Sequence, residues 1–378
     1  MMPAPAHSFS TVTDSPERVA RELSLTLGRV GRASGALVFV SGRLAEGAGA
    51  VADAVAPVLG GVPALVVSGA AVLNEDGELE NQSAASGLVW AGGRPEVLVG
   101  SGGDAEAVAE SLASQLVDRM ARRPAPAAVF IRPDGFSPHA LEPLARGRGL
   151  GQVFGAGSTG PVAAIDAEGK VHSGGGVAIV LRGLTSPAVR SSPACRLLMP
   201  LRRITETRGS MVTRIEGEAA LDVLTAIGNE VSGQPLVLAV LAPEEREGEE
   251  RPELVIRGVQ GVDPVRRGLM ISDEVDEGMR IAFGIRDPGA ARSDLERTVR
   301  EMHRGLAGGV PRFALYLNCA GRGSSLYPSP DVDIGIIRTR FAGVPFAGMQ
   351  SSFEIAPHRE RPTLHLYTGV LALFSAPS

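Results

Sequence analysis

One order of predicted elements recurs along the chain. It consists of a buried strand, a helical crossover, a returning strand that ends in glycine or serine, and a further strand. Short apolar runs of this kind predict buried strands, and the unit as a whole is a βαβ motif extended by one antiparallel strand. The three clear copies run over residues 36–40, 45–59, 63–67 and 87–90; 127–131, 139–146, 151–154 and 177–180; and 313–317, 332–341, 344–347 and 364–374.

A fourth, degraded copy is indicated between residues 236–240 and 279–283, with the acidic run 244–250 as a solvated loop. Four copies predict an α/β fold with mixed sheets and two related halves, that is, a pseudo-twofold internal duplication. The Arg- and Pro-rich segment 185–203 is the expected junction. The expected domains are an N-terminal tail and helix over 1–34, an N-terminal half over 35–200 and a C-terminal half over 201–378.

Size and composition favour a folded, two-part protein. A chain of 378 residues exceeds the size at which one core usually keeps growing, and 44% of its residues are hydrophobic. The net charge of −5 supplies no attraction for nucleic acid or anionic membranes, so neither is expected as a partner. Lys170, the only lysine, lies in a predicted turn, which argues against Schiff-base and P-loop chemistry.

The chain carries no predicted leader or spanning segment. Its first residues lack the cationic and apolar regions of a signal peptide, and no run reaches the roughly 18 apolar residues that cross a bilayer. Two cysteines, Cys195 and Cys319, suit a reducing compartment. We therefore expect a soluble, cytoplasmic protein without a structural disulfide.

Polar residues follow the strands of the third copy and predict a small-ligand site, because ligands collect at the carboxyl ends of parallel strands. Arg322 offers a planar cation for a carboxylate, and Glu354 an acceptor for an ammonium group, a pair that would suit an amino acid. The alternative is an internal salt bridge between Arg322 and Glu354 that braces two loops. The candidate ligand-binding residues are Asn318, Cys319, Gly321, Arg322, Gly323, Ser324, Ser325, Ser351, Ser352 and Glu354, with Ser158 and Thr159 from the second copy.

These segments resemble a known family. The sequences at 317–323, 343–348, 353–357 and 364–368 are similar to the C-terminal FIST domain. Residues 35–200 resemble the N-terminal FIST domain more loosely, through 38–41, 61–67 and 155–159. The resemblance implies a sensory module of bacterial signal transduction that binds a small ligand such as an amino acid and acts through a separate partner protein.

Two other functions stay open. Some FIST-like proteins are described as haem-based nitric oxide sensors, and the resemblance therefore makes His365 or His303 a candidate axial ligand. Cys319 is a candidate nucleophile of a hydrolase, with Arg322 to activate the thiol and His358 or His365 as base, although a cysteine after an apolar strand is more typically a buried structural thiol.

Metal and nucleotide sites are not expected. The six histidines show no zinc-binding spacing. The segment 155–160 matches a dinucleotide fingerprint, but Pro161 and a predicted hairpin follow it where that motif needs a helix. No cofactor is expected apart from the haem alternative.

Overall fold

The computed structural model describes residues 5–121, 123–134, 139–228, 236–245 and 252–375. The chain forms two compact units. The first unit comprises residues 1–192, 295–364 and 368–378, and the second comprises 193–294 and 365–367. The predicted α/β class is confirmed: eight α-helices and four sheets are found in the part of the chain that the structure describes.

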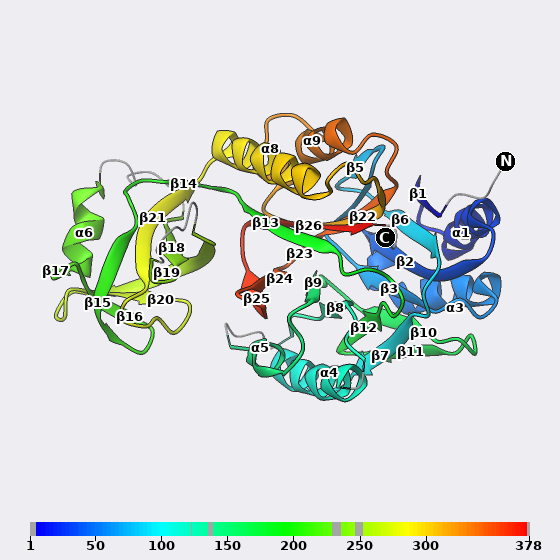
Figure 1. Cartoon of the computed structure of the whole chain (residues 1–378), viewed down its shortest axis with the longest axis horizontal. Coiled ribbons are helices and arrows are strands. Elements are labelled where there is room, and N and C mark those ends of the chain that lie inside the picture. Colours follow the sequence, from blue (N-terminus) through cyan, green and yellow to red (C-terminus); the bar gives the residue numbers. More distant parts are fainter. Residues whose placement is uncertain (1–4, 122, 135–138, 229–235, 246–251, 376–378) are drawn as a thin grey trace. The chain divides into compact units, whose positions relative to one another are not determined.

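The first unit (Figure 1) contains three six-stranded sheets. All three share one order of strands. The first sheet has the order β1 (Ala6–Val12), β6 (Ala84–Ala91), β2 (Ala33–Ser41), β3 (Ala64–Ser68), β10 (Val162–Ile165), β11 (Val171–Gly174). The second has β7 (Glu96–Gly100), β12 (Gly176–Val180), β8 (Ala127–Ile131), β9 (Val153–Gly157), β24 (Glu354–His358), β25 (Arg361–His365). The third has β13 (Ala188–Pro193), β26 (Thr368–Ser375), β22 (Pro311–Cys319), β23 (Phe346–Ser351), β4 (Ala71–Asn74), β5 (Gly77–Leu79).

Each sheet is built around one parallel pair, β2–β3, β8–β9 or β22–β23, as the predicted crossovers require. The hairpin that follows each pair does not stay in its own sheet. Hairpin β4–β5 joins β23, hairpin β10–β11 joins β3, and hairpin β24–β25 joins β9, all in antiparallel pairing. The three copies of the element order therefore exchange hairpins in a closed cycle, which ties together segments far apart in the sequence.

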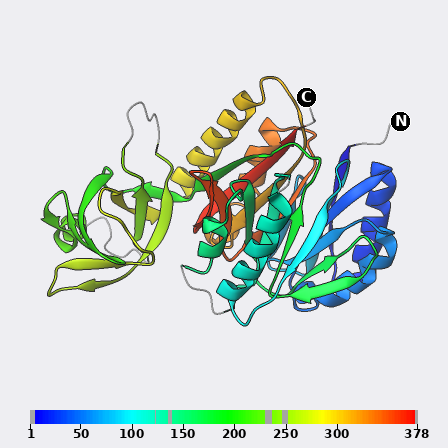
Figure 2. The same cartoon turned by 60° about the horizontal axis from the view of Figure 1, so that its bottom comes forward.

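One buried cluster takes side chains from all three sheets. Within it the rings of Phe39 and Phe130 meet edge to face with centroids 5.8 Å apart, and Trp90 stacks on Phe313 at 5.6 Å. Helices cover the opposite faces of the sheets (Figure 2). They are α1 (Pro16–Val30), α2 (Arg43–Glu46) and α3 (Ala48–Leu59) beside the first sheet; α4 (Ala105–Met120) and α5 (Glu142–Arg146) beside the second; and α8 (Pro288–Gly305) and α9 (Val332–Arg340) beside the third.

Local sequence explains the helix starts. Ser15 caps α1, since its Oγ accepts a hydrogen bond from the Arg18 N–H at 3.2 Å, and Pro16 occupies the first turn, as predicted. The predicted helix over 45–59 is interrupted at Gly47, which separates α2 from α3. Strand β1 and helices α4 and α8 are elements that the sequence analysis does not assign.

The second unit is a barrel of antiparallel strands. Pairing of β18 with β21 closes a ring in the order β21, β15, β16, β20, β19, β18. Its core packs around Ile204, Val212 and Phe283. The elements are β14 (Cys195–Leu197), β15 (Arg202–Arg208), β16 (Met211–Ile215), β17 (Glu218–Ala219), α6 (Ala220–Ala226), β18 (Leu238–Ala242), β19 (Val255–Asp263), β20 (Gly268–Ile271) and β21 (Arg280–Arg286).

This barrel corrects the fourth predicted copy. Strands β18 and β21 occupy the expected positions, but β18 pairs antiparallel with both β19 and β21, so no parallel crossover unit forms there. The strand topology accordingly does not show the expected pseudo-twofold duplication. In sequence the barrel lies between β13 and α8, ahead of the strands of the third copy. Most of the acidic run 244–250 lies outside the described residues.

Among the helices that the structure describes, none combines the length and the apolar character needed to cross a membrane.

Candidate functional site

The carboxyl ends of the three parallel pairs are joined by a cycle of backbone hydrogen bonds. In each bond, a backbone N–H at the end of one copy's second parallel strand donates to a carbonyl at the end of the second parallel strand of another copy. The bonds run from Thr159 to Ser68 at 2.9 Å, from Ser352 to Gly157 at 3.0 Å and from Ala70 to Gln350 at 2.8 Å. Strand ends that converge in this way form the part of an α/β fold where ligands are most often bound.

Two candidate segments meet in this cycle. The Ser158 hydroxyl donates to the Ser68 carbonyl at 2.8 Å, and the Ser352 hydroxyl donates to the Ser158 carbonyl at 3.2 Å. Ser158 is fully buried, whereas the neighbouring Thr159 is exposed. The structure therefore brings the Ser158–Thr159 turn against the Ser351–Ser352 turn.

A polar cluster, formed by Asn318, Ser351 and Glu354, is buried at the same strand ends and is called the Glu354 cluster below. The Ser351 hydroxyl lies 2.8 Å from Glu354 Oε1 and 3.0 Å from the Asn318 carbonyl oxygen. All three residues have no exposed surface. Glu354 Oε2 and both polar atoms of the Asn318 amide form no hydrogen bond with the described residues. Buried polar groups are costly to leave unsatisfied, so these three atoms are suited to a further polar partner.

Burial determines the protonation of Glu354. Transfer out of water raises the pKa of its carboxyl well above the usual value, and the Ser351 hydroxyl, the Thr368 backbone and the charge of Arg322 offset this only in part. Burial therefore favours the neutral carboxyl over the carboxylate when nothing is bound. A cation placed beside Oε2 would favour the carboxylate and so displace the proton.

Arg322 is fully engaged elsewhere. Its Nε lies 2.7 Å from Asp333 Oδ2 and its Nη2 lies 3.0 Å from Oδ1, a bidentate pair in which neither side chain has exposed surface. Nη1 donates to the Ser192 carbonyl at 3.0 Å, and Nη2 also donates to the Tyr327 hydroxyl at 2.9 Å. Arg322 thus pairs with Asp333 rather than with Glu354, which replaces the internal salt bridge considered as an alternative above.

Tyrosine hydroxyls complete the surroundings of Asp333. Tyr316 and Tyr327 donate to its two carboxylate oxygens at 2.7 and 2.8 Å. Burial alone would raise the pKa of Asp333, but the charge of Arg322 and these hydrogen bonds hold it below the usual value. The network is fully satisfied and holds the loop between β22 and α9 in place.

The other residues of that loop bond within it or to the exchanged hairpin. Cys319 is 7% exposed, and its Sγ accepts a hydrogen bond from the Gly321 N–H at 3.4 Å. Ser325 is exposed and donates to the Arg322 carbonyl at 3.0 Å. The Ser324 N–H lies 3.0 Å from Glu80 Oε1.

Gly323 permits the close approach of Glu80. Its φ is +62°, and a Cβ atom there would lie 2.0 Å from Glu80 Oε1. Glu80 also accepts a hydrogen bond from Gln350 Nε2 at 2.9 Å. The Glu80 carboxylate, which belongs to another copy, therefore ties this loop to the end of β23.

Sequence reasoning missed the acidic residues around Arg322. Asp333 lies in the first turn of α9, and Glu78 and Glu80 belong to the exchanged hairpin or its end. Burial, followed by the charges of Asp333, Glu80 and Asp331, raises the pKa of Glu78 to about 8, although Arg322 lowers it. An acidic residue inside an otherwise helical apolar segment was the one available signal for Asp333.

The two histidines considered as haem ligands lie in different elements. His303 is an exposed residue of α8 whose ring centroid lies 5.9 Å from that of Phe341, and His365 is buried at the end of β25. Across the described residues, no group of three or more His, Cys, Asp or Glu side chains is arranged to hold a metal ion. The fingerprint-like segment 155–160 is followed by strand β10, as predicted, and not by a helix.

The fold and the site define an α/β protein that encloses a small polar cluster where the strand ends of three sheets meet. Residues 35–218 match the FIST N domain and residues 220–357 match the FIST C domain, so the chain belongs to the FIST family. It is 29% identical over 211 residues to the uncharacterized protein Rv0628c of Mycobacterium tuberculosis, a match that covers 54% of this chain and 55% of the relative. It is also 29% identical over 203 residues to the uncharacterized protein Mb0898c of Mycobacterium bovis, covering 51% and 52%. The chain thus spans about half the length of the curated relatives it matches.

Proposed function

We propose that this FIST protein is an intracellular sensory protein that binds an amino acid, or a similar small metabolite with an ammonium group, at the Glu354 cluster. The observation that carries the proposal is the set of buried polar atoms without partners among the described residues: Glu354 Oε2, Asn318 Nδ2 and Asn318 Oδ1. The Ser351 hydroxyl bonds the Glu354 carboxyl and the Asn318 backbone carbonyl. A fully buried carboxyl and a fully buried side-chain amide are a costly arrangement unless a ligand or water completes them.

The three atoms match the two ends of a zwitterion. The Glu354 carboxylate would accept hydrogen bonds from an ammonium group, and the Asn318 amide nitrogen would donate to a carboxylate oxygen. Since Arg322 is saturated by Asp333, its role in this proposal is to position the loop that follows β22 rather than to touch the ligand.

A ligand must gain access, because Asn318, Ser351 and Glu354 have no exposed surface. We propose that the loop over residues 320–331 opens and closes over the site. Its tip is exposed at Ser324 and Ser325, while its base is fixed by Arg322. Opening would change the surface around Glu80, and a separate partner protein would bind one loop position in preference to the other.

A thermal-shift screen of the purified chain against amino acids, primary amines and small carboxylates tests the proposal. A compound that binds only the folded protein stabilises it, by about 2.7 kcal/mol at a concentration of about 100 times Kd. We expect hits that carry an ammonium group, and no shift from the matching compounds in which hydroxyl replaces the amine. A screen without amine hits, or with equal shifts from both series, would overturn the proposal.

A further inference from the structure

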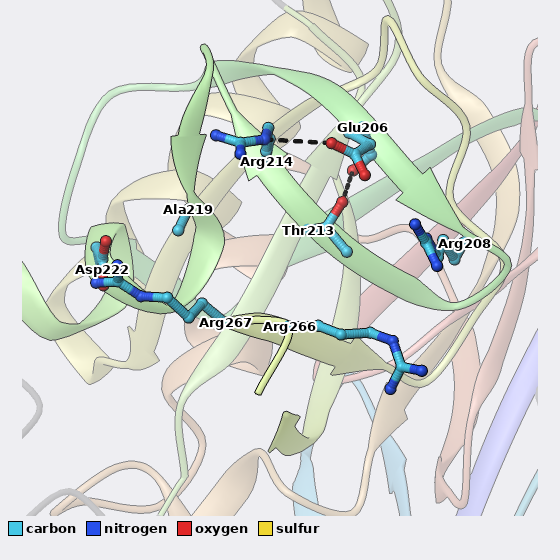
Figure 3. A pocket seen from close by; sticks show the side chains of 8 residues that line it. All are labelled: Glu206, Arg208, Thr213, Arg214, Ala219, Asp222, Arg266 and Arg267. Carbon is cyan, nitrogen blue, oxygen red and sulfur yellow. Dashed lines mark hydrogen bonds and ion pairs between the residues drawn. The ribbon is translucent and has the colours of Figure 1, made fainter. Parts of the chain in front are cut away.

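The barrel of the second unit carries a pocket that the proposed ligand site does not use. It is a cavity of about 410 Å³ lined by residues of β15, β16 and β17, the start of α6 and the turn between β19 and β20 (Figure 3). Four arginines line it, Arg208, Arg214, Arg266 and Arg267, against two carboxylates, Glu206 and Asp222. The lining therefore has a net charge of +2, in a chain whose net charge is −5.

The two carboxylates are already used by two of the arginines. Arg214 Nε lies 3.2 Å from Glu206 Oε2, and Arg267 pairs with Asp222. Arg208 is exposed, and its guanidinium forms no ion pair or hydrogen bond with the residues that the structure describes. Arg266 keeps one nitrogen on Asp263 at 2.8 Å and is 56% exposed. Arg208 and Arg266 lie toward the same end of the pocket and leave positive charge there for an external anion (Figure 3).

The hairpin that carries Arg266 also presents apolar surface. Val262 and Val265 are 52% and 89% exposed, among the most exposed large apolar residues of the described chain. Arg267 holds a positive φ of 53° in the same turn, where glycine would be the unstrained choice. A turn that keeps an arginine at such a position and exposes valines beside it is better suited to a partner surface than to solvent alone.

We propose that Arg208 and Arg266, together with the exposed Val262 and Val265 of the hairpin that carries Arg266, dock an acidic segment of a partner protein. Arginine clusters recognise carboxylate-rich segments through planar hydrogen bonds, and the neighbouring valines would contact apolar residues of the same segment. A small free anion would use the arginines but not the valines. The proposal names the kind of partner through which the sensor would act, and so it rests on that part of the proposed function.

A peptide-binding experiment on the full chain tests this assignment. The probe is a fluorescein-labelled peptide of alternating Glu and Leu, followed by fluorescence anisotropy at low and moderate salt. We expect binding that weakens with salt, and a loss of affinity of about tenfold or more in the double variant Arg208→Glu/Arg266→Glu. The control Arg18→Glu/Arg21→Glu makes the same charge change at two exposed positions of α1 and should stay within about twofold of wild type.

Further arms distinguish the occupant. Val265→Ser should also weaken peptide binding, and a peptide with Gln in place of Glu should not bind. No binding by wild type, or equal losses in the two double variants, would overturn the proposal. Competition by inorganic phosphate as strong as by unlabelled peptide would overturn it too, in favour of a small-anion site. None of these outcomes bears on thermal shifts by amine ligands, so failure here is separable from failure of the ligand site.

Discussion

The Arg322 guanidinium and the Asp333 carboxylate form an ion pair, 2.7 Å from Nε to Oδ2, in which neither side chain has any exposed surface. It joins the loop after β22 to the first turn of α9. Because that loop borders the Glu354 cluster, the pair determines how firmly the proposed ligand site is held.

Removal of one partner should be severe. Arg322→Met leaves the Asp333 charge buried without its cation, and we expect the first unit to lose about 3–5 kcal/mol of its free energy of unfolding. Urea unfolding followed by the fluorescence of Trp90, the only tryptophan and a residue of the first unit, measures this loss. The control Arg119→Met removes a partly exposed pair with Glu96 in the same unit and should cost about 1 kcal/mol or less. Equal costs in the two variants would contradict the role given to Arg322.

Glu78 should make stability depend on pH. Its pKa is about 8 in the folded protein against 4.5 as the ordinary value, so between these pH values the folded state binds more protons than the unfolded state. The contribution of Glu78 to the free energy of unfolding is then fully present below about pH 4.5 and falls as the pH rises toward 8. Melting temperatures of wild type and Glu78→Gln across this range should show a shallower decline in the variant. Glu110→Gln, at an exposed position of α4, should keep the wild-type slope; the same slope in all three proteins would contradict the prediction.

Two glycine substitutions should act in opposite directions. A Cβ at Gly348 would lie 1.7 Å from the Tyr316 carbonyl oxygen of the adjacent strand, so Gly348→Ala should destabilise the first unit by about 1–3 kcal/mol or more. Gly28 is an exposed residue within α1 with nothing within 4 Å of the added atom, so Gly28→Ala should stabilise by about 0.5–1 kcal/mol. Chemical denaturation of both variants provides the comparison, and effects of the same sign would show that the strand packing is described wrongly.

Local sequence signals predicted many of the elements, although not β1, α4 or α8, and they did not predict which strands pair with one another. Apolar runs and glycine-serine turns predict the parallel pairs and α9, since those signals are local. The exchanged hairpins could not be predicted, because nothing in 71–79 specifies pairing with a strand more than 260 residues later. The prediction of a fourth copy was wrong for the same reason. The apolar runs of β18 and β21 predict strands, but they do not specify that these two strands pair antiparallel with each other.

The convergence of the candidate segments was predicted from the sequence, but the pairing of their side chains was not. The convergence of Ser158 with Ser352 follows from the strand-end rule. The partner of Arg322 does not, because Asp333 is brought beside it by the packing of α9, and Glu80 by the exchange of hairpins. Side-chain pairing across such contacts depends on tertiary structure that no spacing in the sequence records.

Glu354 should be required for ligand binding without being required for folding. Glu354→Gln imitates the neutral carboxyl that burial favours, so its melting temperature without ligand should stay close to that of wild type. The variant lacks the carboxylate that an ammonium group needs. The apparent affinity for an amine ligand, measured from the thermal shifts, should therefore fall at least about tenfold. Glu110→Gln is the matched control and should keep the full shift. An unchanged shift in Glu354→Gln would place the ligand elsewhere.

The most direct measurement is calorimetric titration of wild type with an amine hit at pH 7, in two buffers that differ in ionisation enthalpy. Because the pKa of Glu354 is raised when the cluster is empty, binding of an ammonium group at Oε2 should release about one proton. The predicted result is an apparent binding enthalpy that differs between the buffers by about one ionisation enthalpy in wild type and not in Glu354→Gln. Identical enthalpies in both buffers for wild type would contradict the claim that Glu354 receives the ligand.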